Sequence, residues 1–446
     1  MRVLLISSNQ IGPTQISGWV PVVPLGLAYV AASLRNAGHQ VELLDLCFVG
    51  KQDAAIVDAI ERLQPEVIGI SFRNIEMMAY FQNISFLGEL RWVVELCRQH
   101  SMARIVLGGS GFSIMPGQIL RYTGLDVGIV GEGEWSLLEL LTRLECSLDY
   151  SDVPGVVRIE GNSVHLTPPT HNHDLTDLPA PARDLIDHSP YIKAGGIANL
   201  QTKRGCPFQC IYCIYPLVEG KNVRCRPPEE IVDEFRELNH RFGVSIAYIV
   251  DNQFNYPPEH AKEICEGLIS IRDEVKVWWS CMVNPGYLSE ELVFLLRLAR
   301  CAMVELGVES ASKSVLSNLG KNYTVQEVRN AIMLLKEYKL PFNTWVLFGG
   351  PGETEETVQE TLEFLVELEV PRVLFSIGLR VYPGTKIERL MLDEGKIKPE
   401  IELLDPVFYL AMDAEAIVEL VQPYLYGRKD WHIAALRHPV IARHDI

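Results

Sequence analysis

The first 145 residues alternate short apolar runs with longer amphipathic stretches. The runs have the length of buried strands, and the stretches between them repeat apolar residues at helical spacing. The predicted strands are residues 3–6, 41–44, 67–72, 104–107 and 127–130. The predicted helices are residues 25–37, 54–63, 86–99 and 117–122. This alternation predicts a Rossmann-like, doubly wound α/β domain with a mostly parallel sheet, whose ligand lies at the carboxyl ends of the strands.

A second alternation of the same kind begins near residue 198. Its predicted strands are residues 199–202, 247–250, 275–281, 303–307, 343–348 and 373–379. Its predicted helices are residues 228–242, 258–271, 289–299, 324–338 and 354–368. Ser289 and Thr324 stand where two of these helices start and are suitable N-cap residues. Six βα units in a row predict a partial (β/α)6 barrel of the TIM type, with its chemistry at the carboxyl ends of the strands.

Two further segments differ from these alternations. Residues 146–197 are rich in proline and contain one predicted hairpin, residues 156–159 against 164–166, so we expect a linker there. The last 51 residues show no further βα unit and form a small module. We therefore expect the Rossmann-like domain at 1–145, the linker at 146–197, the barrel at 198–395 and the module at 396–446.

Composition narrows the class of protein. Hydrophobic residues make up 48% of the 446 residues, enough for a large core. The formal net charge of -17 argues against nucleic acid as a partner, because phosphate binding needs clustered lysine and arginine. The apolar run at residues 3–6 is too short for a signal peptide or a membrane span. We expect a cytoplasmic enzyme without a membrane span, in which ten cysteines favour metal or redox chemistry over disulfides.

Three of the cysteines are crowded into one short loop after the first barrel strand. Cys206, Cys210 and Cys213 have the spacing C-x3-C-x2-C. Three thiolates on one loop can each bind a different iron of a [4Fe–4S] cluster and leave the fourth iron open to a small molecule. Two alternatives stay open from the residues alone. The thiols could be unrelated packed side chains, or a zinc site that takes a fourth ligand from elsewhere.

The spacing, together with the preceding residues 202–205, resembles the radical S-adenosylmethionine (SAM) superfamily. Segments at later strand ends agree in order with that family: residues 251–254, 307–310, 348–354 and 380–385. The resemblance implies that the three cysteines hold a [4Fe–4S] cluster. It also implies SAM contacts at Tyr212, Asp251, Asn252, Glu309, Ser310, Gly349 and Gly350. Asn284 stands where the family often has an arginine, so we carry no contact onto that position.

The N-terminal half resembles the cobalamin-binding domain that is fused to some radical SAM enzymes. The resemblance rests on residues 24–29, 37–39, 107–109 and 131–134. It implies cobalamin contacts at Gly26, Ser71, Gly108, Gly109, Ser110, Gly131, Glu132 and Gly133. Residues 7–25 contain no histidine, and His39 precedes the second strand, so no histidine is expected on cobalt. A domain that has lost cobalamin would show the same absence.

Together the two resemblances imply a cobalamin-dependent radical SAM enzyme and favour C-methylation of an unactivated carbon in a small molecule. In that chemistry the reduced cluster cleaves SAM to a 5′-deoxyadenosyl radical, and methylcobalamin delivers the methyl group. The expected partners are a small-molecule substrate and an electron donor such as flavodoxin or ferredoxin. No individual catalytic residue follows from the sequence.

Three other functions remain open. A cyclase, rearrangement enzyme or oxidoreductase could use the same cofactors without methyl transfer. A tRNA methylthiotransferase would need three more N-terminal cysteines, and only the widely spaced Cys47, Cys97 and Cys146 are available. A non-enzymatic electron-transfer protein would need no SAM contacts.

Overall fold

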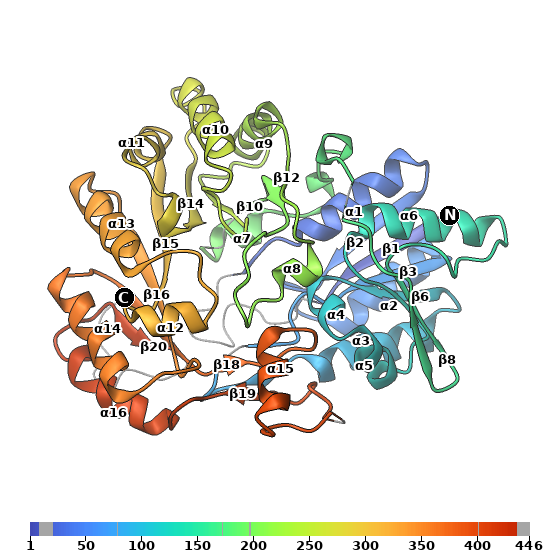
Figure 1. The fold of residues 1–446 in the computed structure, drawn as a ribbon. Coiled ribbons are helices and arrows are strands. Elements are labelled where there is room, and N and C mark those ends of the chain that lie inside the picture. The colour runs from blue at the N-terminus through green and yellow to red at the C-terminus, as the bar shows by residue number, and fades with distance from the viewer. Residues whose placement is uncertain (9–20, 78, 172, 196–197, 400, 435–446) are drawn as a thin grey trace.

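The computed structural model describes residues 1–8, 21–77, 79–171, 173–195, 198–399 and 401–434. It consists of two α/β halves that face each other (Figure 1). The N-terminal half lies on the right of the figure and the barrel half on the left, with the C-terminal helices below the barrel. No helix among these residues is long and apolar enough to cross a lipid bilayer.

The N-terminal half is built on a seven-stranded sheet in the order β2-β1-β3-β6-β7-β8-β9. All five predicted strands are confirmed, and they run parallel to their neighbours. They are β1 (Arg2–Ser7), β2 (Gln40–Asp45), β3 (Val67–Ser71), β6 (Arg104–Gly108) and β7 (Val127–Ile129). The helices are α1 (Leu25–Asn36), α2 (Gln52–Leu63), α3 (Leu87–His100), α4 (Ser110–Ile114), α5 (Pro116–Thr123) and α6 (Gly133–Glu145). Helices α1 and α6 pack together on one face and α2, α3 and α5 on the other, so the sheet is doubly wound.

The predicted hairpin forms, but it belongs to this sheet. Strand β8 (Val156–Glu160) pairs antiparallel with β7, and β9 (Ser163–Leu166) pairs with β8. Val156 and Val157 are buried, so the hairpin covers the edge that β7 would otherwise leave unpaired. A second, small hairpin follows β3, formed by β4 (Glu76–Met77) and β5 (Ile84–Ser85). Between residues 167 and 195, the described residues form only short turns of helix, such as α7 (Ser189–Lys193).

The barrel half is a curved, wholly parallel sheet in the order β10-β13-β14-β15-β16-β17-β20. Its first six strands confirm the prediction: β10 (Ala198–Leu200), β13 (Ile246–Ile249), β14 (Trp278–Val283), β15 (Cys301–Glu309), β16 (Phe342–Phe348) and β17 (Val373–Ile377). The outer helices are α9 (Pro228–His240), α10 (Pro258–Ser270), α11 (Glu290–Leu298), α12 (Lys313–Asn318), α13 (Val325–Glu337) and α14 (Glu355–Glu367). Ser289 and Thr324 cap α11 and α13 as expected, and Thr324 forms a capping box with Glu327.

The C-terminal segment completes the sheet, which differs from the predicted six strands. Helix α16 (Ala414–Leu425) leads into β20 (Trp431–Ile433), which pairs with β17 as a seventh strand. Trp431 is buried and donates its indole N–H to the carbonyl of Val370 at 3.0 Å. Strand β20 thus provides hydrogen-bond partners for β17, which would be an open edge in a sheet of six strands. The remaining elements are α8 (Tyr215–Val218), α15 (Lys386–Asp393) and the short pairs β11 (Lys203–Arg204) with β12 (Arg224–Cys225) and β18 (Leu379–Arg380) with β19 (Phe408–Tyr409).

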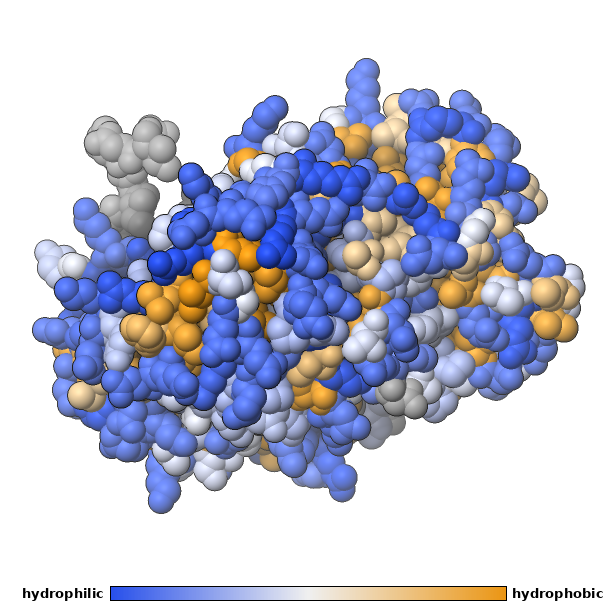
Figure 2. Space-filling model, turned by 90° about the horizontal axis from the view of Figure 1, so that it is seen from above, coloured by the Kyte–Doolittle hydropathy of each residue, from blue (hydrophilic) through white to orange (hydrophobic). Residues whose placement is uncertain are grey.

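The two halves share one interface core. The apolar cluster around α2 and α3 continues into residues of α12, β18 and α15, including Leu319 and Ile387. Buried polar contacts cross the same boundary: Glu76 pairs with Arg380 and Tyr382, and Tyr29 accepts from Arg226. Polar residues cover most of the surface seen from above, with an apolar patch over the barrel half (Figure 2). The carboxyl ends of both sheets are therefore held facing each other across a fixed gap.

Candidate functional site

A cavity of about 1120 Å³ occupies the gap between the two halves. One side, the N-terminal wall, is formed by the carboxyl ends of β1, β3, β6 and β7. The other side, the barrel wall, is formed by the cysteine loop (residues 205–214) and the carboxyl ends of the barrel strands. Both parallel sheets thus present the ends at which such folds bind ligands to one shared space.

The N-terminal wall is made of small residues and backbone. All eight residues predicted to contact cobalamin line the cavity: Gly26, Ser71, Gly108, Gly109, Ser110, Gly131, Glu132 and Gly133. Gly109 has φ +99°, and an added Cβ would lie 2.7 Å from the carbonyl oxygen of Phe72. An added Cβ on Gly26 would meet no atom within 4 Å, so this glycine faces open space. The glycines at these strand ends let a large, flat ligand such as a corrinoid approach the backbone closely.

The sequence predicts that no histidine binds cobalt on this wall, and His39 is the histidine considered there. His39 lies at the start of β2, at the opposite edge of the sheet, 3.1 Å from the amino group of Met1. Among the described residues that line the cavity, none is a histidine. His171 packs behind this wall, where an added Cβ on Gly131 would lie 3.3 Å from its Cε1.

Arg73 is a cavity residue that sequence reasoning missed. It follows β3 and lines the N-terminal wall, and burial lowers the pKa of its guanidinium. No carboxylate of the described residues lies within ion-pairing distance of it. Its position just after a strand end was the only signal available, because nothing in its neighbours marks it as special. The wall therefore carries one cation that a polar or anionic group of a ligand can neutralise.

The cysteine loop places three free thiols on the barrel wall. Cys206, Cys210 and Cys213 all line the cavity. The backbone fixes the loop, since Cys206 donates its N–H to Gly220 at 3.0 Å and Ile211 donates to Leu319 at 3.0 Å. Burial, with a smaller contribution from the neighbouring thiols Cys210 and Cys206, raises the pKa of the Cys213 thiol to about 12.

These thiols do not gather around one point. No group of three histidine, cysteine or acidic residues within the described ranges could hold a single metal ion. A cubane cluster makes no such demand, because each thiolate binds a different iron. Cys206 is buried and Cys210 and Cys213 are half-buried, and three thiolates on one such loop need a cationic partner, which the irons of a cluster supply. The donor set therefore fits the predicted [4Fe–4S] cluster better than the zinc alternative.

The end of β13 contributes both a structural carboxylate and two free acceptors. Asp251 is buried and accepts from the backbone N–H of Thr202 at 2.7 Å, with Lys203 Nζ at 3.4 Å. It therefore anchors the start of the cysteine loop while also lining the cavity. Asn252 donates to Glu219 at 2.8 Å. The side-chain oxygens Asn252 Oδ1 and Gln253 Oε1 are buried without a partner, although both residues line the cavity. Two orphaned acceptors beside the thiols fit the ammonium group of SAM.

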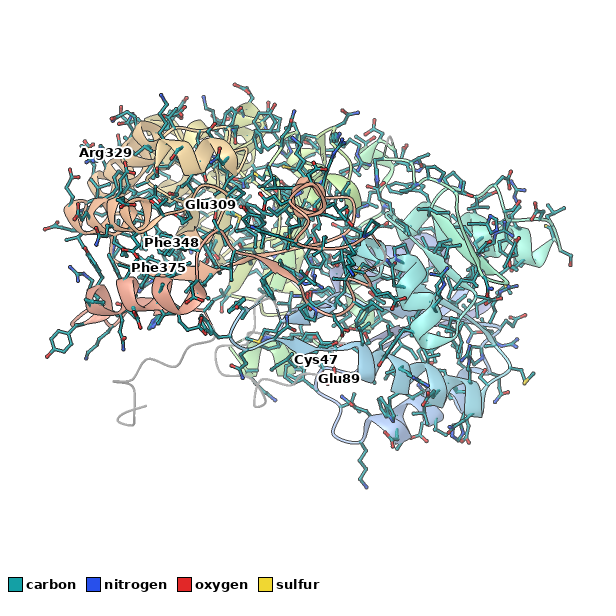
Figure 3. The ribbon with its side chains drawn as sticks, turned by 60° about the horizontal axis from the view of Figure 1, so that its bottom comes forward. Cys47, Glu89, Glu309, Arg329, Phe348 and Phe375 are labelled. Carbon is teal, nitrogen blue, oxygen red and sulfur yellow. The ribbon has the colours of Figure 1, made fainter. Side chains whose placement is uncertain are left out.

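Glu309 sits in a buried polar cluster at the end of β15. Its Oε1 accepts from Lys321 Nζ at 2.8 Å and from the Tyr212 hydroxyl at 3.1 Å. Burial opposes the charge on Lys321, but Glu309 together with Tyr212, Tyr323 and Cys210 outweighs burial and raises the pKa of that lysine. Glu309 also has φ +59°, a left-handed conformation that costs energy in a non-glycine residue. It lies in the interior of the molecule, whereas Arg329 of α13 lies at the outer edge (Figure 3). Lys321 was not predicted, because it pairs with a strand end twelve residues away.

Three residues predicted to contact SAM do not line the cavity, and their contact with SAM stays a prediction. Ser310 is buried, its hydroxyl 3.2 Å from that of Thr361, and it accepts from the N–H of Ser312 at 3.1 Å. An added Cβ on Gly349 would lie 2.6 Å from Leu410, and one on Gly350 would lie 3.0 Å from Leu319. None of the three lines the cavity. These three residues lie behind the barrel wall. Neighbouring side chains pack closely there and leave room only for small residues.

Fold and site together define a protein that holds a thiol-bound cluster opposite a corrinoid-type domain. The sequence model of the radical SAM superfamily matches residues 200–365, and that of the B12 binding domain matches residues 20–141. The chain is thus a radical SAM protein with an N-terminal B12-binding domain, and its cofactors are a [4Fe–4S] cluster, SAM and cobalamin.

Several known proteins are similar to this chain. Tryptophan 2-C-methyltransferase of Streptomyces laurentii is 25% identical, over 88% of this chain and 74% of the relative. The solved structure of the radical SAM methyltransferase TsrM of Kitasatospora setae, with cobalamin and a [4Fe–4S] cluster bound, is 26% identical. It superimposes with a TM-score of 0.78 over 88% of this chain and 78% of TsrM. An anaerobic magnesium-protoporphyrin IX monomethyl ester cyclase of Cereibacter sphaeroides is 26% identical, over 81% of this chain and 59% of the relative.

Proposed function

We propose that this protein is a cobalamin-dependent radical SAM C-methyltransferase that acts on an unactivated carbon of a small molecule. The observation that carries the proposal is the single cavity, whose opposite walls suit a corrinoid and a cluster with SAM. When bound, these groups supply a methyl donor and a radical that can remove hydrogen from carbon. A substrate carbon held between the two walls would be within reach of both.

The chain's own residues hold and orient these groups. We assign the cluster to Cys206, Cys210 and Cys213. We assign SAM to Asn252 and Gln253 for its ammonium group and to Glu309 for a hydroxyl, with Tyr212 and Asp251 beside them. We assign the corrinoid to the glycines and serines of the N-terminal wall. Ser310, Gly349 and Gly350 are left out, because they lie behind the barrel wall.

Aromatic side chains narrow the access to the cavity. Tyr80 packs edge-on against Phe81 and Phe408, with ring centroids 5.1 and 5.5 Å apart. All three line the cavity, and they come from the β4–β5 hairpin and from β19. We propose that they surround the substrate and exclude water, which would otherwise quench reactive species.

The electron donor is proposed to dock on the outer side of the cysteine loop. Pro207 and Gln209 are exposed there, and the exposed Lys386 donates to Gln209 Oε1 at 2.9 Å. A lysine beside the cluster suits an acidic one-electron carrier such as flavodoxin or ferredoxin.

The experiment that tests methyl transfer follows both halves of SAM. The anaerobic holoenzyme is incubated with reductant, methyl-labelled SAM and a small-molecule extract from the cells that produce it. We expect label in one small molecule and the formation of S-adenosylhomocysteine, which is what remains of SAM after its methyl group has left. A changed but unlabelled molecule, with 5′-deoxyadenosine as the only SAM product, would replace methylation by a cyclase-type reaction. The similarity to the protoporphyrin ester cyclase makes that reaction the second candidate.

The methylthiotransferase alternative gains no support from the cysteine positions. Cys47 follows β2, Cys97 lies within α3, and Cys146 follows α6. None of them lines the cavity, and Cys47 and Cys97 are buried in different apolar clusters. A second cluster on these three thiols is therefore not part of the proposal.

A further inference from the structure

Four buried charges meet where the N-terminal wall touches the hairpin that carries the cysteine loop. Glu132 and Glu134 lie at the start of α6, and Arg204 and Arg224 lie on β11 and β12. Arg224 donates to both carboxylate oxygens of Glu132, at 2.6 and 3.0 Å. Arg204 lies 2.6 Å from Glu134 and 3.5 Å from Glu132. The four side chains are only 5–12% exposed. We call these four residues the charge network.

The two arginines cannot be stable without the two glutamates. Arg204 and Arg224 are register partners on the antiparallel strands β11 and β12, so their charges stand side by side. Like charges placed opposite each other destabilise a strand pair, and an uncompensated buried charge costs several kcal/mol. The compensating carboxylates come from the other half of the molecule. Formation of the β11–β12 hairpin is therefore coupled to docking of the two halves.

The charge network is only a few bonds away from both cofactor positions. Gly131 and Gly133, on either side of Glu132, line the N-terminal wall. Arg204 precedes Cys206 by two residues, and Arg224 also donates to the carbonyl of Glu219 at 3.1 Å. The carbonyl of the next residue, Gly220, accepts the N–H of Cys206. A shift of the Glu132–Arg224 ion pair would move the cysteine loop relative to the N-terminal wall.

We propose that Glu132 and Arg224 are positioning residues that set the separation between the cluster and the corrinoid. Glu132 was expected to contact cobalamin, but Arg224 occupies both of its oxygens, so its role is exerted through the loop. The proposal rests on the two cofactors being bound and does not depend on methyl transfer. Neither SAM nor substrate is needed to test it.

The test is a double-mutant cycle on the full-length protein, with Glu132→Gln, Arg224→Gln and the combination of both. Each variant is reconstituted anaerobically with iron, sulfide and hydroxocobalamin. Iron and corrinoid per chain are measured, and the magnetic coupling between Co(II) and the reduced cluster gives their distance. Each single change removes the two-bond pairing of a buried charge, leaving Arg224 without its carboxylate or Glu132 with only Arg204 at 3.5 Å, so we expect cluster content to fall at least about fivefold. The double variant removes both charges and is expected to recover to within about twofold of the unchanged protein.

The matched control is Glu139→Gln on the same helix, where Glu139 pairs with Arg143 at the surface. It should alter neither cofactor content nor distance. Should the single variants fail to fold, Glu132→Asp keeps the charge but shortens its reach, and we expect a folded protein with a changed cobalt–cluster distance. An unchanged distance in Glu132→Asp, or a double variant that loses as much cluster as the two single variants together, would overturn the proposal.

Discussion

The two walls of the cavity are built on opposite principles. The N-terminal wall presents backbone, glycine and serine at its strand ends, with Arg73 as its unpaired cation among the described residues, and its carboxylates Glu132 and Glu134 are paired with arginines of the barrel half. The barrel wall is formed from charged side chains that are already paired with each other, such as Asp251 with Lys203 and Glu309 with Lys321. A smooth wall suits a ligand that binds through a large flat area. A wall of fixed charges suits a small, polar ligand that must lie in one orientation.

The difference predicts that the two walls can be damaged independently. A change of the barrel wall should affect the cluster or SAM and leave the corrinoid in place. A change of the N-terminal wall outside the charge network, such as at Gly26, should do the reverse. The predictions below test this separation in order of decreasing effect.

The largest effect is expected from the thiols. Replacing Cys206, Cys210 and Cys213 together with alanine should abolish the absorbance near about 400 nm and the bound iron, because no cluster can form. Corrinoid binding should persist, because the N-terminal wall is untouched. Cys146→Ala, at an exposed cysteine, serves as the control and should keep its cluster. A triple variant that retains its iron would remove the cluster from this loop.

The next effect is expected from the lysine that holds Glu309. Lys321→Met leaves the carboxylate buried beside Tyr212 without its cation, which should cost about 3 kcal/mol of stability. Glu309 would also lose its fixed orientation, so SAM affinity should fall roughly a hundredfold. Equilibrium dialysis with SAM and thermal unfolding measure the two quantities. Lys313→Met, at an exposed lysine, should change neither, and an equal effect in both variants would contradict the assignment.

On the N-terminal wall, Gly26→Leu should separate binding from stability. The new side chain projects from α1 into open space, so it should obstruct the corrinoid and weaken its binding at least about tenfold. Leucine is a better helix former than glycine, so the free energy of unfolding should stay unchanged or rise by up to about 1 kcal/mol. The thermal midpoint should follow it. Gly88→Leu in α3 is the matched control, because its Cβ also meets no atom and it lies away from the cavity. Corrinoid titration distinguishes the two variants. Equal affinity in both would show that the corrinoid does not reach Gly26.

The smallest effect concerns Glu353, in the loop after β16. Burial raises the pKa of this carboxyl from 4.5 to about 7, and its Oε2 has no partner among the described residues. Between these values the folded protein keeps a proton that the unfolded chain releases. Stability should therefore fall as the pH rises from about 4.5 to 7, by at most about 3 kcal/mol, and stay low above that range.

Glu353→Gln removes this titration. The variant should match the unchanged protein in thermal midpoint at pH 5 and exceed it at pH 8. Glu360→Gln, at an exposed position on the following helix α14, is the control and should leave the difference between the two pH values as it was. If the unchanged protein and Glu353→Gln respond alike to pH, the carboxyl is not neutral when buried.

The sequence by itself determined the secondary structure and the class of chemistry. Strands and helices follow from apolar periodicity, which is local, and their predicted bounds agree with the structure to within a few residues. The cysteine spacing is equally local, because three thiols on one loop remain close in any fold. The glycines of the N-terminal wall were predicted correctly as cavity residues for a related reason. Parallel strands place all of their carboxyl ends along one edge.

Only the tertiary structure decided how side chains pair and which way strand ends face. Glu309 and Ser310 are neighbours, yet Glu309 lines the cavity and Ser310 is buried against Thr361 behind the wall. Lys321, Arg73 and Arg224 gained their roles from partners or surfaces far away in the sequence. The seventh strand, β20, likewise depends on an edge that six strands leave open. Such pairings depend on long-range packing and burial, which periodicity along the chain does not encode.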